Sequence, residues 1–127
     1  MESKELTKAE EELMQYLWKI KKGFLKDIVE QFPEPKPANT TVSTFLRILV
    51  NKGFVGYTTY GKANEYYPKV TKKAYFSGRL KFLVDKFFNG SAPGFVSFFA
   101  NEQMSLSELE ELKAFIDKKI RDLKKNE

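Results

Sequence analysis

Apolar residues recur at helical spacing near the start of the chain, after a polar segment that fits a helix N-terminus. Thr7 and Glu10 have the spacing of a capping box, in which hydroxyl and carboxylate each bond a backbone N–H three residues away. The apolar stripe that follows consists of Leu13, Met14, Leu17, Trp18 and Ile20. This pattern predicts a helix that buries the stripe and ends near Lys21-Lys22-Gly23.

A short apolar segment and three prolines come next. Phe24-Leu25 predicts a brief strand, and the apolar spacing after it predicts a short helix over residues 26–32. Three prolines within residues 33–38 exclude helix continuation, because proline lacks an N–H and restricts the residue before it. We therefore expect a stiff loop between two helices.

The segment 39–53 separates an apolar face from a polar one. Its apolar positions follow the helical i, i+3, i+4 pattern and are Val42, Phe45, Leu46, Leu49 and Val50. The other side carries hydroxyls and one cation, at Thr40, Thr41, Ser43, Thr44 and Arg47. Asn39 is a favourable N-cap and Gly53 a favourable C′ residue, so a helix is predicted between them.

Two β-rich runs follow this helix. Residues 54–60 and 65–70 are rich in β-branched and aromatic side chains, and the turn between them contains Gly61 and Lys62. This pattern predicts a β-hairpin, with Pro68 on an edge because proline cannot donate a ladder hydrogen bond. A polar-faced helix followed by a hairpin is the arrangement of a winged helix-turn-helix. Residues 1–71 are therefore expected to form a winged-helix DNA-binding domain.

The remaining residues, 72–127, predict about three helices with broad apolar faces. Thr71 can cap the first, and Ser105 with Glu108 repeats the capping-box spacing before the last. Fewer than about 60 residues rarely bury a core of their own, so either the N-terminal domain or a second copy must cover these faces. A homodimer is favoured because a helix-turn-helix reader gains specificity from two half-sites. The expected contact residues are Phe76, Leu80, Leu83, Phe87, Leu109, Leu112, Phe115 and Ile116.

The predicted fold is thus mainly α with a small β-hairpin, a winged helix-turn-helix N-terminal domain plus a C-terminal helical dimerisation region. The net charge of +5 is concentrated between residues 36 and 73, which carry seven Lys or Arg and one Glu. Such a surface suits contact with phosphates. Lys62 and Lys69 are the expected phosphate contacts. Further candidates are Lys36, Lys52, Lys72 and Lys73, and about half of all six lysines are expected to be only solvated.

The composition argues against catalysis. The chain has no Cys and no His, which removes thiolate chemistry and imidazole ligands or bases. Carboxylates such as Glu10, Glu11, Glu12, Glu110 and Glu111 fall on amphipathic helices and fit solvated faces. The sequence shows no nucleophile–base pair, so we expect no enzyme, no metal and no cofactor. No apolar run approaches the roughly 20 residues that span a bilayer, and we expect a cytoplasmic protein without membrane insertion. A winged-helix module that binds protein instead of DNA stays open as an alternative, although the basic segment and hydroxyl-rich helix argue against it.

Four ordered blocks resemble the penicillinase-repressor family of winged-helix bacterial regulators, which has a copper-responsive branch. The blocks are residues 6–18, ending in Leu-Trp; residues 40–54, with a Thr-rich head and a Lys-Gly tail; Tyr66-Tyr67-Pro68; and the C-terminal segments 81–91 and 106–112. The resemblance covers about residues 5–120. It implies a repressor that binds a palindromic double-stranded DNA operator as a homodimer.

The resemblance also implies roles for individual residues. The recognition helix would contact bases or phosphates through Asn39, Thr40, Thr41, Ser43, Thr44 and Arg47. Members partnered by a membrane sensor-protease are cleaved at an Asn-Phe bond, and the corresponding bond here is Ser97-Phe98, without the Asn. The copper-responsive branch binds metal through Cys-x-Cys pairs, which this chain lacks, so copper sensing is not expected.

Overall fold

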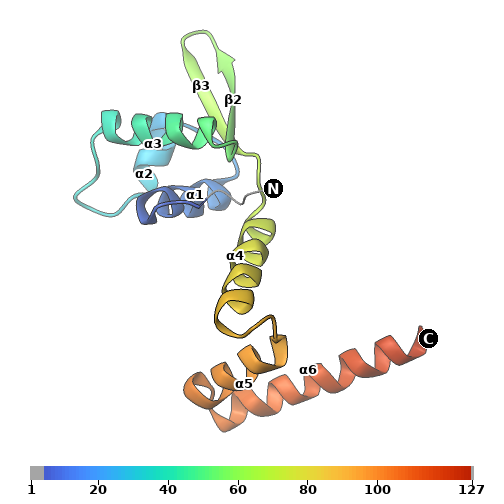
Figure 1. Cartoon of the computed structure of the whole chain (residues 1–127). Coiled ribbons are helices and arrows are strands. Elements are labelled where there is room, and N and C mark those ends of the chain that lie inside the picture. Colours follow the sequence, from blue (N-terminus) through green and yellow to red (C-terminus); the bar gives the residue numbers. More distant parts are fainter. Residues whose placement is uncertain (1–4, 127) are drawn as a thin grey trace. The chain divides into compact units, whose positions relative to one another are not determined.

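A computed structural model describes residues 5–126, which fold into six helices and three strands (Figure 1). In chain order they are α1 (Lys8–Ile20), β1 (Gly23–Phe24), α2 (Leu25–Gln31), α3 (Asn39–Asn51), β2 (Val55–Tyr60), β3 (Ala63–Pro68), α4 (Lys72–Phe87), α5 (Ala92–Gln103) and α6 (Leu106–Lys125). The chain divides into two compact units, one ending at Arg79 and one beginning at Leu80. Residues 1–4 and Glu127, which the predicted domain ranges include, lie outside the described part. The predicted functional division at residue 71 stays a prediction.

Helix α1 begins with the predicted capping box. Thr7 N donates to Glu10 Oε1 at 3.0 Å, and Glu10 N donates to Thr7 Oγ1 at 3.2 Å. The helix ends at Ile20, and Lys21 follows with a positive φ of 74°. The local sequence signals therefore set both ends of α1 as expected.

The core of the first unit lies between α1, α2, α3 and the start of β2. Leu13, Met14 and Leu17 of α1 are fully buried. They pack in one cluster with Ile28, Phe32, Val42, Leu46, Leu49, Phe54 and Val55. Trp18 packs against this cluster, and its indole N–H donates to Val70 O at 2.8 Å. The predicted apolar faces of the first three helices thus meet in one core.

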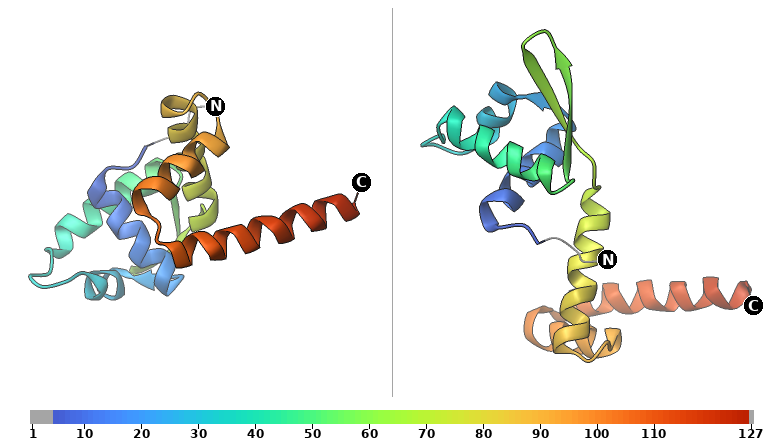
Figure 2. Two further views of the ribbon diagram at one scale, coloured as in Figure 1. Left: turned by 90° about the horizontal axis from the view of Figure 1, so that it is seen from below. Right: turned by 45° about the horizontal axis from the view of Figure 1, so that its top comes forward.

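The sheet is three-stranded, in the order β1-β3-β2, and antiparallel. The sequence predicted only the two-stranded hairpin and did not pair the short strand before α2, so that expectation was incomplete. Strand β3 is central in the sheet, but at Pro68 it has a neighbouring strand, β2, on one side only, so the expectation that Pro68 lies on an edge holds at that position. Proline is tolerated there because β1 pairs only with Glu65 and Tyr66 and does not reach Pro68. The hairpin extends past α3 (Figure 2).

Three helix boundaries differ from the expectation. The N-cap of α3 is Ala38, without a side-chain cap, and Asn39 is the first helical residue, so the predicted Asn39 cap was wrong. Helix α2 runs one residue earlier at both ends than predicted. The end of α3 is as predicted: Gly53 has φ +85°, and Phe54 N donates to Leu49 O at 2.9 Å. This is a Schellman ending, which favours glycine because of the positive φ.

The second unit contains the end of α4 with α5 and α6. Ser105 and Glu108 form the predicted capping box, with bonds of 2.9 and 3.3 Å. The aromatic residues between positions 95 and 99 lie inside α5, where Phe95 and Phe98 each contact Phe88 with ring centroids 5.7 Å apart. None of the side chains from Leu80 to Asn126 is buried. None of the described helices is both long and apolar enough to cross a bilayer.

Candidate nucleic-acid interface

The polar face of α3 is exposed along its first three turns. Val42, Leu46 and Leu49 point into the core, which turns the opposite side of the helix outward. Of the predicted contact residues, those that are exposed are Asn39, Thr40, Thr41, Ser43 and Arg47. The helix therefore presents short hydroxyl side chains, an amide and a guanidinium to solvent, and these groups can approach base edges or phosphates.

Thr44 differs from the other predicted contacts. It is half-buried, and its hydroxyl donates to Thr40 O at 2.9 Å, one turn back along α3. The hydroxyl proton is therefore held by the helix itself, while the oxygen keeps its capacity to accept. We expect Thr44 to contribute less as a donor than Thr40 or Thr41.

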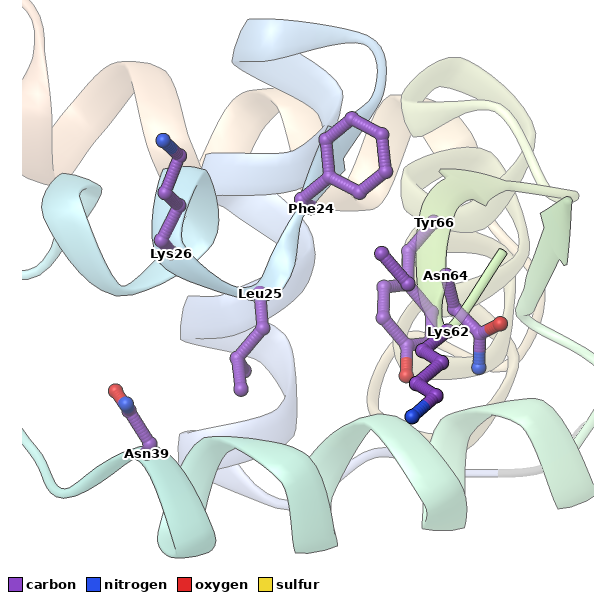
Figure 3. Close-up of a pocket in the computed structure, with 8 residues that line it drawn as sticks. Phe24, Leu25, Lys26, Asn39, Lys62, Asn64 and Tyr66 are labelled. Atoms are coloured by element: carbon purple, nitrogen blue, oxygen red, sulfur yellow. The ribbon is translucent and has the colours of Figure 1, made fainter. Parts of the chain in front are cut away.

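The hairpin lines two hollows beside α3. One, of about 480 Å³, lies between α2, the start of α3 and the hairpin turn, and its polar lining residues are Lys26, Asn39, Lys62 and Asn64 (Figure 3). The other, of about 280 Å³, lies along α3 and is lined by Ser43, Arg47 and Asn51 with Tyr57, Asn64 and Tyr66. No carboxylate lines either hollow within the described part of the chain. Both are open, cationic and adjacent to the polar face of α3.

Lys62 is exposed at the turn of the hairpin, as predicted. In Figure 3 its amine and the amide nitrogen of Asn64 lie on the same side, toward α3. Lys69 is also exposed but lies beyond β3 and lines neither hollow; its backbone N–H donates to Phe54 O at 2.8 Å. Of the two predicted hairpin cations, only Lys62 thus lies beside α3.

Sequence reasoning missed Lys26, Asn51 and Asn64 as interface candidates. Lys26 was expected at the start of the short helix, which the structure shows as α2, but only tertiary packing places it beside the start of α3. Asn51 follows Thr44 by seven residues, so helical spacing alone could have placed it on the polar face. Asn64 was assigned to the turn, and only the register of β2 and β3 places it on the side facing α3.

Two of the candidate phosphate contacts are instead held by the fold. Lys36 Nζ donates to Glu30 O at 3.0 Å and to Phe32 O at 2.7 Å, at the C-terminal end of α2. Lys52 Nζ donates to Glu10 Oε1 at 2.7 Å and to Glu5 O at 3.1 Å. A cation near the last carbonyls of a helix, as at Lys36, is favourable. Both lysines stabilise the winged-helix unit in this structure.

Glu10, the acidic partner of the Glu10–Lys52 ion pair, is almost fully buried. Glu10 is only 4% exposed. Burial raises the pKa of Glu10, but the hydrogen bonds from Lys52 and Thr7 together outweigh burial, and the net pKa lies below the usual 4.5. Glu10 is therefore ionised at neutral pH and joins the start of α1 to the end of α3.

The predicted dimerisation residues lie on α4 and α6. Phe76, Phe87 and Phe115 are 62%, 66% and 64% exposed in the single chain, which is unusual for phenylalanine. The remaining ones are exposed or half-buried: Leu80, Leu83, Leu109, Leu112 and Ile116. Ser97 and Phe98 are exposed on α5.

Comparison with known proteins agrees with this architecture. The chain is 28% identical to the methicillin resistance regulatory protein MecI of Staphylococcus aureus over 117 residues, which covers 91% of this chain and 95% of that protein. It is 24% identical to the penicillinase repressor of Bacillus licheniformis over 110 residues, 85% of this chain and 86% of that one. A chain in the solved structure of the hsRosR-S4 complex superposes with a TM-score of 0.56 at 17% identity, covering 94% of both chains. That likeness supports the winged helix-turn-helix fold alone.

The family match spans both units of the chain. Residues 6–118 match the penicillinase repressor family, from the start of the described chain into α6. Members of this family are transcriptional repressors and not enzymes. The chain belongs to the penicillinase repressor family.

Proposed function

We propose that this protein represses transcription by binding a palindromic DNA operator as a homodimer. The observation that carries the proposal is the exposed polar face of α3 next to the cationic hairpin turn. Hydroxyls, amides and cations gather there, and no carboxylate lines either neighbouring hollow within residues 5–126. Family membership supports the same function.

The recognition helix supplies the proposed base contacts. Thr40, Thr41 and Ser43 are short, so they require close approach of α3 to the floor of the major groove. Arg47 is long enough to reach a base edge from the third turn of α3, where a guanidinium can bind guanine through two hydrogen bonds. Lys62 and Lys69 would contact phosphates, which adds affinity but little sequence information.

The apolar surface of the second unit supports the homodimer. Twelve of the sixteen large apolar side chains that are exposed in residues 5–126 lie between Leu80 and Leu123. On α6 the apolar residues recur at spacings of three and four, at Leu109, Leu112, Ile116, Ile120 and Leu123. Its remaining faces carry the ion pairs Lys113–Asp117 and Lys118–Asp122, at 3.0 and 2.9 Å. Such a one-sided stripe requires a partner surface, and a second copy offers the same stripe through a two-fold axis.

A membrane sensor-protease is a further proposed partner. The Ser97-Phe98 bond, where the resemblance places the cleavage site, lies inside α5. Proteases bind their substrates in an extended form, so cleavage there would require α5 to unwind. Replacing Ser97 with Asn tests whether the missing residue limits cleavage when a family sensor-protease is co-expressed.

The test of the main proposal is selection of duplexes from a random library with the full chain, followed by measurement of affinity and stoichiometry. The proposal expects enriched sequences with an inverted repeat, half-sites about 10 base pairs apart centre to centre, and two chains per duplex. Absence of enrichment at low salt would contradict it.

A further inference from the structure

The side-chain amide of Asn64 is oriented by a hydrogen bond on the face of the hairpin that lies toward α3. It is paired directly with Thr59 across β2 and β3. The Thr59 hydroxyl donates to Asn64 Oδ1 at 2.8 Å. Since the amide oxygen accepts this bond, the amide nitrogen is turned to the other side. Figure 3 shows that nitrogen directed toward α3, on the same side as the amine of Lys62.

The surroundings of this amide favour an anion. Asn64 lines both hollows, so it lies where they meet. The cations that line them are Lys26, Lys62 and Arg47. The neighbouring carboxylate, Glu65, lies on the opposite face of the hairpin because side chains alternate along a strand. Among these cations, the uncharged amide can orient a bound anion through a hydrogen bond, while the cations balance the charge of the anion.

We infer that the Asn64 amide nitrogen and the Lys62 amine together bind one backbone phosphate of duplex DNA, on the strand that passes between α3 and the hairpin. The inference rests on the proposed function and adds a contact at the same site. Lys62 supplies charge, and Asn64 supplies a directed hydrogen bond that fixes the register of the hairpin on the backbone. Thr59 is a positioning residue, because it orients the amide and does not itself reach the phosphate.

The sharpest test is the replacement Asn64→Asp, compared with Asn64→Ala. Aspartate keeps the size of the side chain and the oxygen that accepts from Thr59, but it places a negative charge where the amide nitrogen was. Loss of one solvent-exposed hydrogen bond in Asn64→Ala should weaken binding about 3- to 10-fold on both a selected and a scrambled duplex. Repulsion from the phosphate should make Asn64→Asp at least about tenfold weaker again at low salt. Trp18 fluorescence and circular dichroism check that each variant is folded.

A matched control separates a local contact from the general effect of added charge. Thr58 is exposed on the opposite face of the same strand pair, across from Glu65. Thr58→Asp adds the same charge to the same hairpin, away from α3. We expect it to weaken binding less than threefold, since only long-range screened repulsion acts. Equal losses for Asn64→Asp and Thr58→Asp would overturn the inference.

Neutral backbone substitution identifies the phosphate. In a series of duplexes, each carries one methylphosphonate in place of a phosphate. At one position this change should weaken binding of the wild-type chain but cause no further loss in Asn64→Ala, which already lacks the contact. Additive losses at every position would overturn the contact. Isotope-labelled protein is also titrated with inorganic phosphate, and the side-chain NH₂ resonance of Asn64 is followed by NMR. This experiment distinguishes a site for free phosphate from a site for the DNA backbone. A shift as large as the one that DNA causes would overturn the assignment to duplex. If the wild-type chain binds no duplex at all, the proposed function fails; if it binds but these variants behave alike, only this inference fails.

Discussion

Replacing Lys52 with Met should destabilise the winged-helix unit without changing its contacts to DNA. Lys52 lies in the most basic part of the sequence, yet its amine is 2.7 Å from Glu10 Oε1. Methionine has a similar length and can fill the same space without charge. The substitution therefore isolates the loss of the ion pair, and Lys62→Ala, at the exposed hairpin turn, is the natural comparison.

The size of the effect follows from the exposure of the two partners. Removing one member of a buried ion pair costs about 3–5 kcal/mol. Here the Lys52 side chain is 28% exposed and that of Glu10 only 6%, and Thr7 N still donates to Glu10 after the change. Water and Thr7 offset part of the loss, so we expect about 2 kcal/mol. For a unit of this size that corresponds to a fall in Tm of about 8–16 °C.

The destabilisation should depend on pH. The pKa of Glu10 lies below 4.5 in the folded chain, so the pair contributes its full stability above the unfolded pKa. The contribution is lost as pH falls through the lower, folded pKa. In Lys52→Met the amine that lowers the pKa of Glu10 is absent while burial still raises it, so the pKa of Glu10 is higher than in the wild type. The difference in stability between wild type and variant should therefore be largest near neutral pH and shrink below about pH 4.

Trp18 provides the assay, because it is the only tryptophan in the chain and packs against the core of the first unit. Thermal unfolding followed by its fluorescence reports that unit even if the second unit unfolds separately. Below the unfolding transition, Lys52→Met should bind a scrambled duplex with wild-type affinity and salt dependence, whereas Lys62→Ala should keep the Tm and lower the salt slope by about one. An unchanged Tm for Lys52→Met, or a loss of stability that is equal at pH 7 and pH 3, would refute the reasoning.

Three further predictions concern the polar face of α3, the second unit and α4. Thr41→Ala combined with Thr44→Ala should weaken binding to the selected duplex by about 1–3 kcal/mol and leave the dimer intact; unchanged affinity in a mobility-shift titration would exclude that role. Replacing Phe115 and Ile116 with Asp should give monomers with poor DNA affinity, and a variant that still sediments as a dimer would remove the interface assignment. Burial, with a 2.7 Å hydrogen bond to Glu11, raises the pKa of Tyr75 to about 12, so the stability from this tyrosine is complete below pH 10 and is lost toward pH 12. Tyr75→Phe should therefore cost about 1 kcal/mol and remove one ionisation near pH 12 from an alkaline ultraviolet titration.

Most of the fold could be predicted because its helix boundaries are encoded locally. The capping boxes at Thr7 and Ser105 and the Gly53 ending each need only residues within one turn, and each appears in the structure. The pairing of β1 with β3 was not predicted, because it joins residues about 40 positions apart and a two-residue strand carries no periodic signal. The prediction that Asn39 is the N-cap of α3 was wrong for a related reason. The course of the loop before α3 decides whether the helix begins at Asn39 or one residue later, and local sequence does not encode that course.

The candidate site was only partly predictable for the same physical reason. The polar face of α3 follows from helical spacing, so the exposed Thr and Ser residues were found from sequence. Charge alone did not separate Lys52 from Lys62, since the partner of Lys52 is 42 residues earlier on another helix. Asn64 carries no charge, and its role depends on the strand register that pairs it with Thr59.

The central claim is that two copies of this chain, joined through the second unit, present two α3 helices to one duplex. Analytical ultracentrifugation of the full chain, alone and with a duplex selected from a random library, tests it most directly. We expect a dimer in the absence of DNA and a complex of two chains with one duplex. A monomer that does not bind any duplex at low ionic strength would contradict the account.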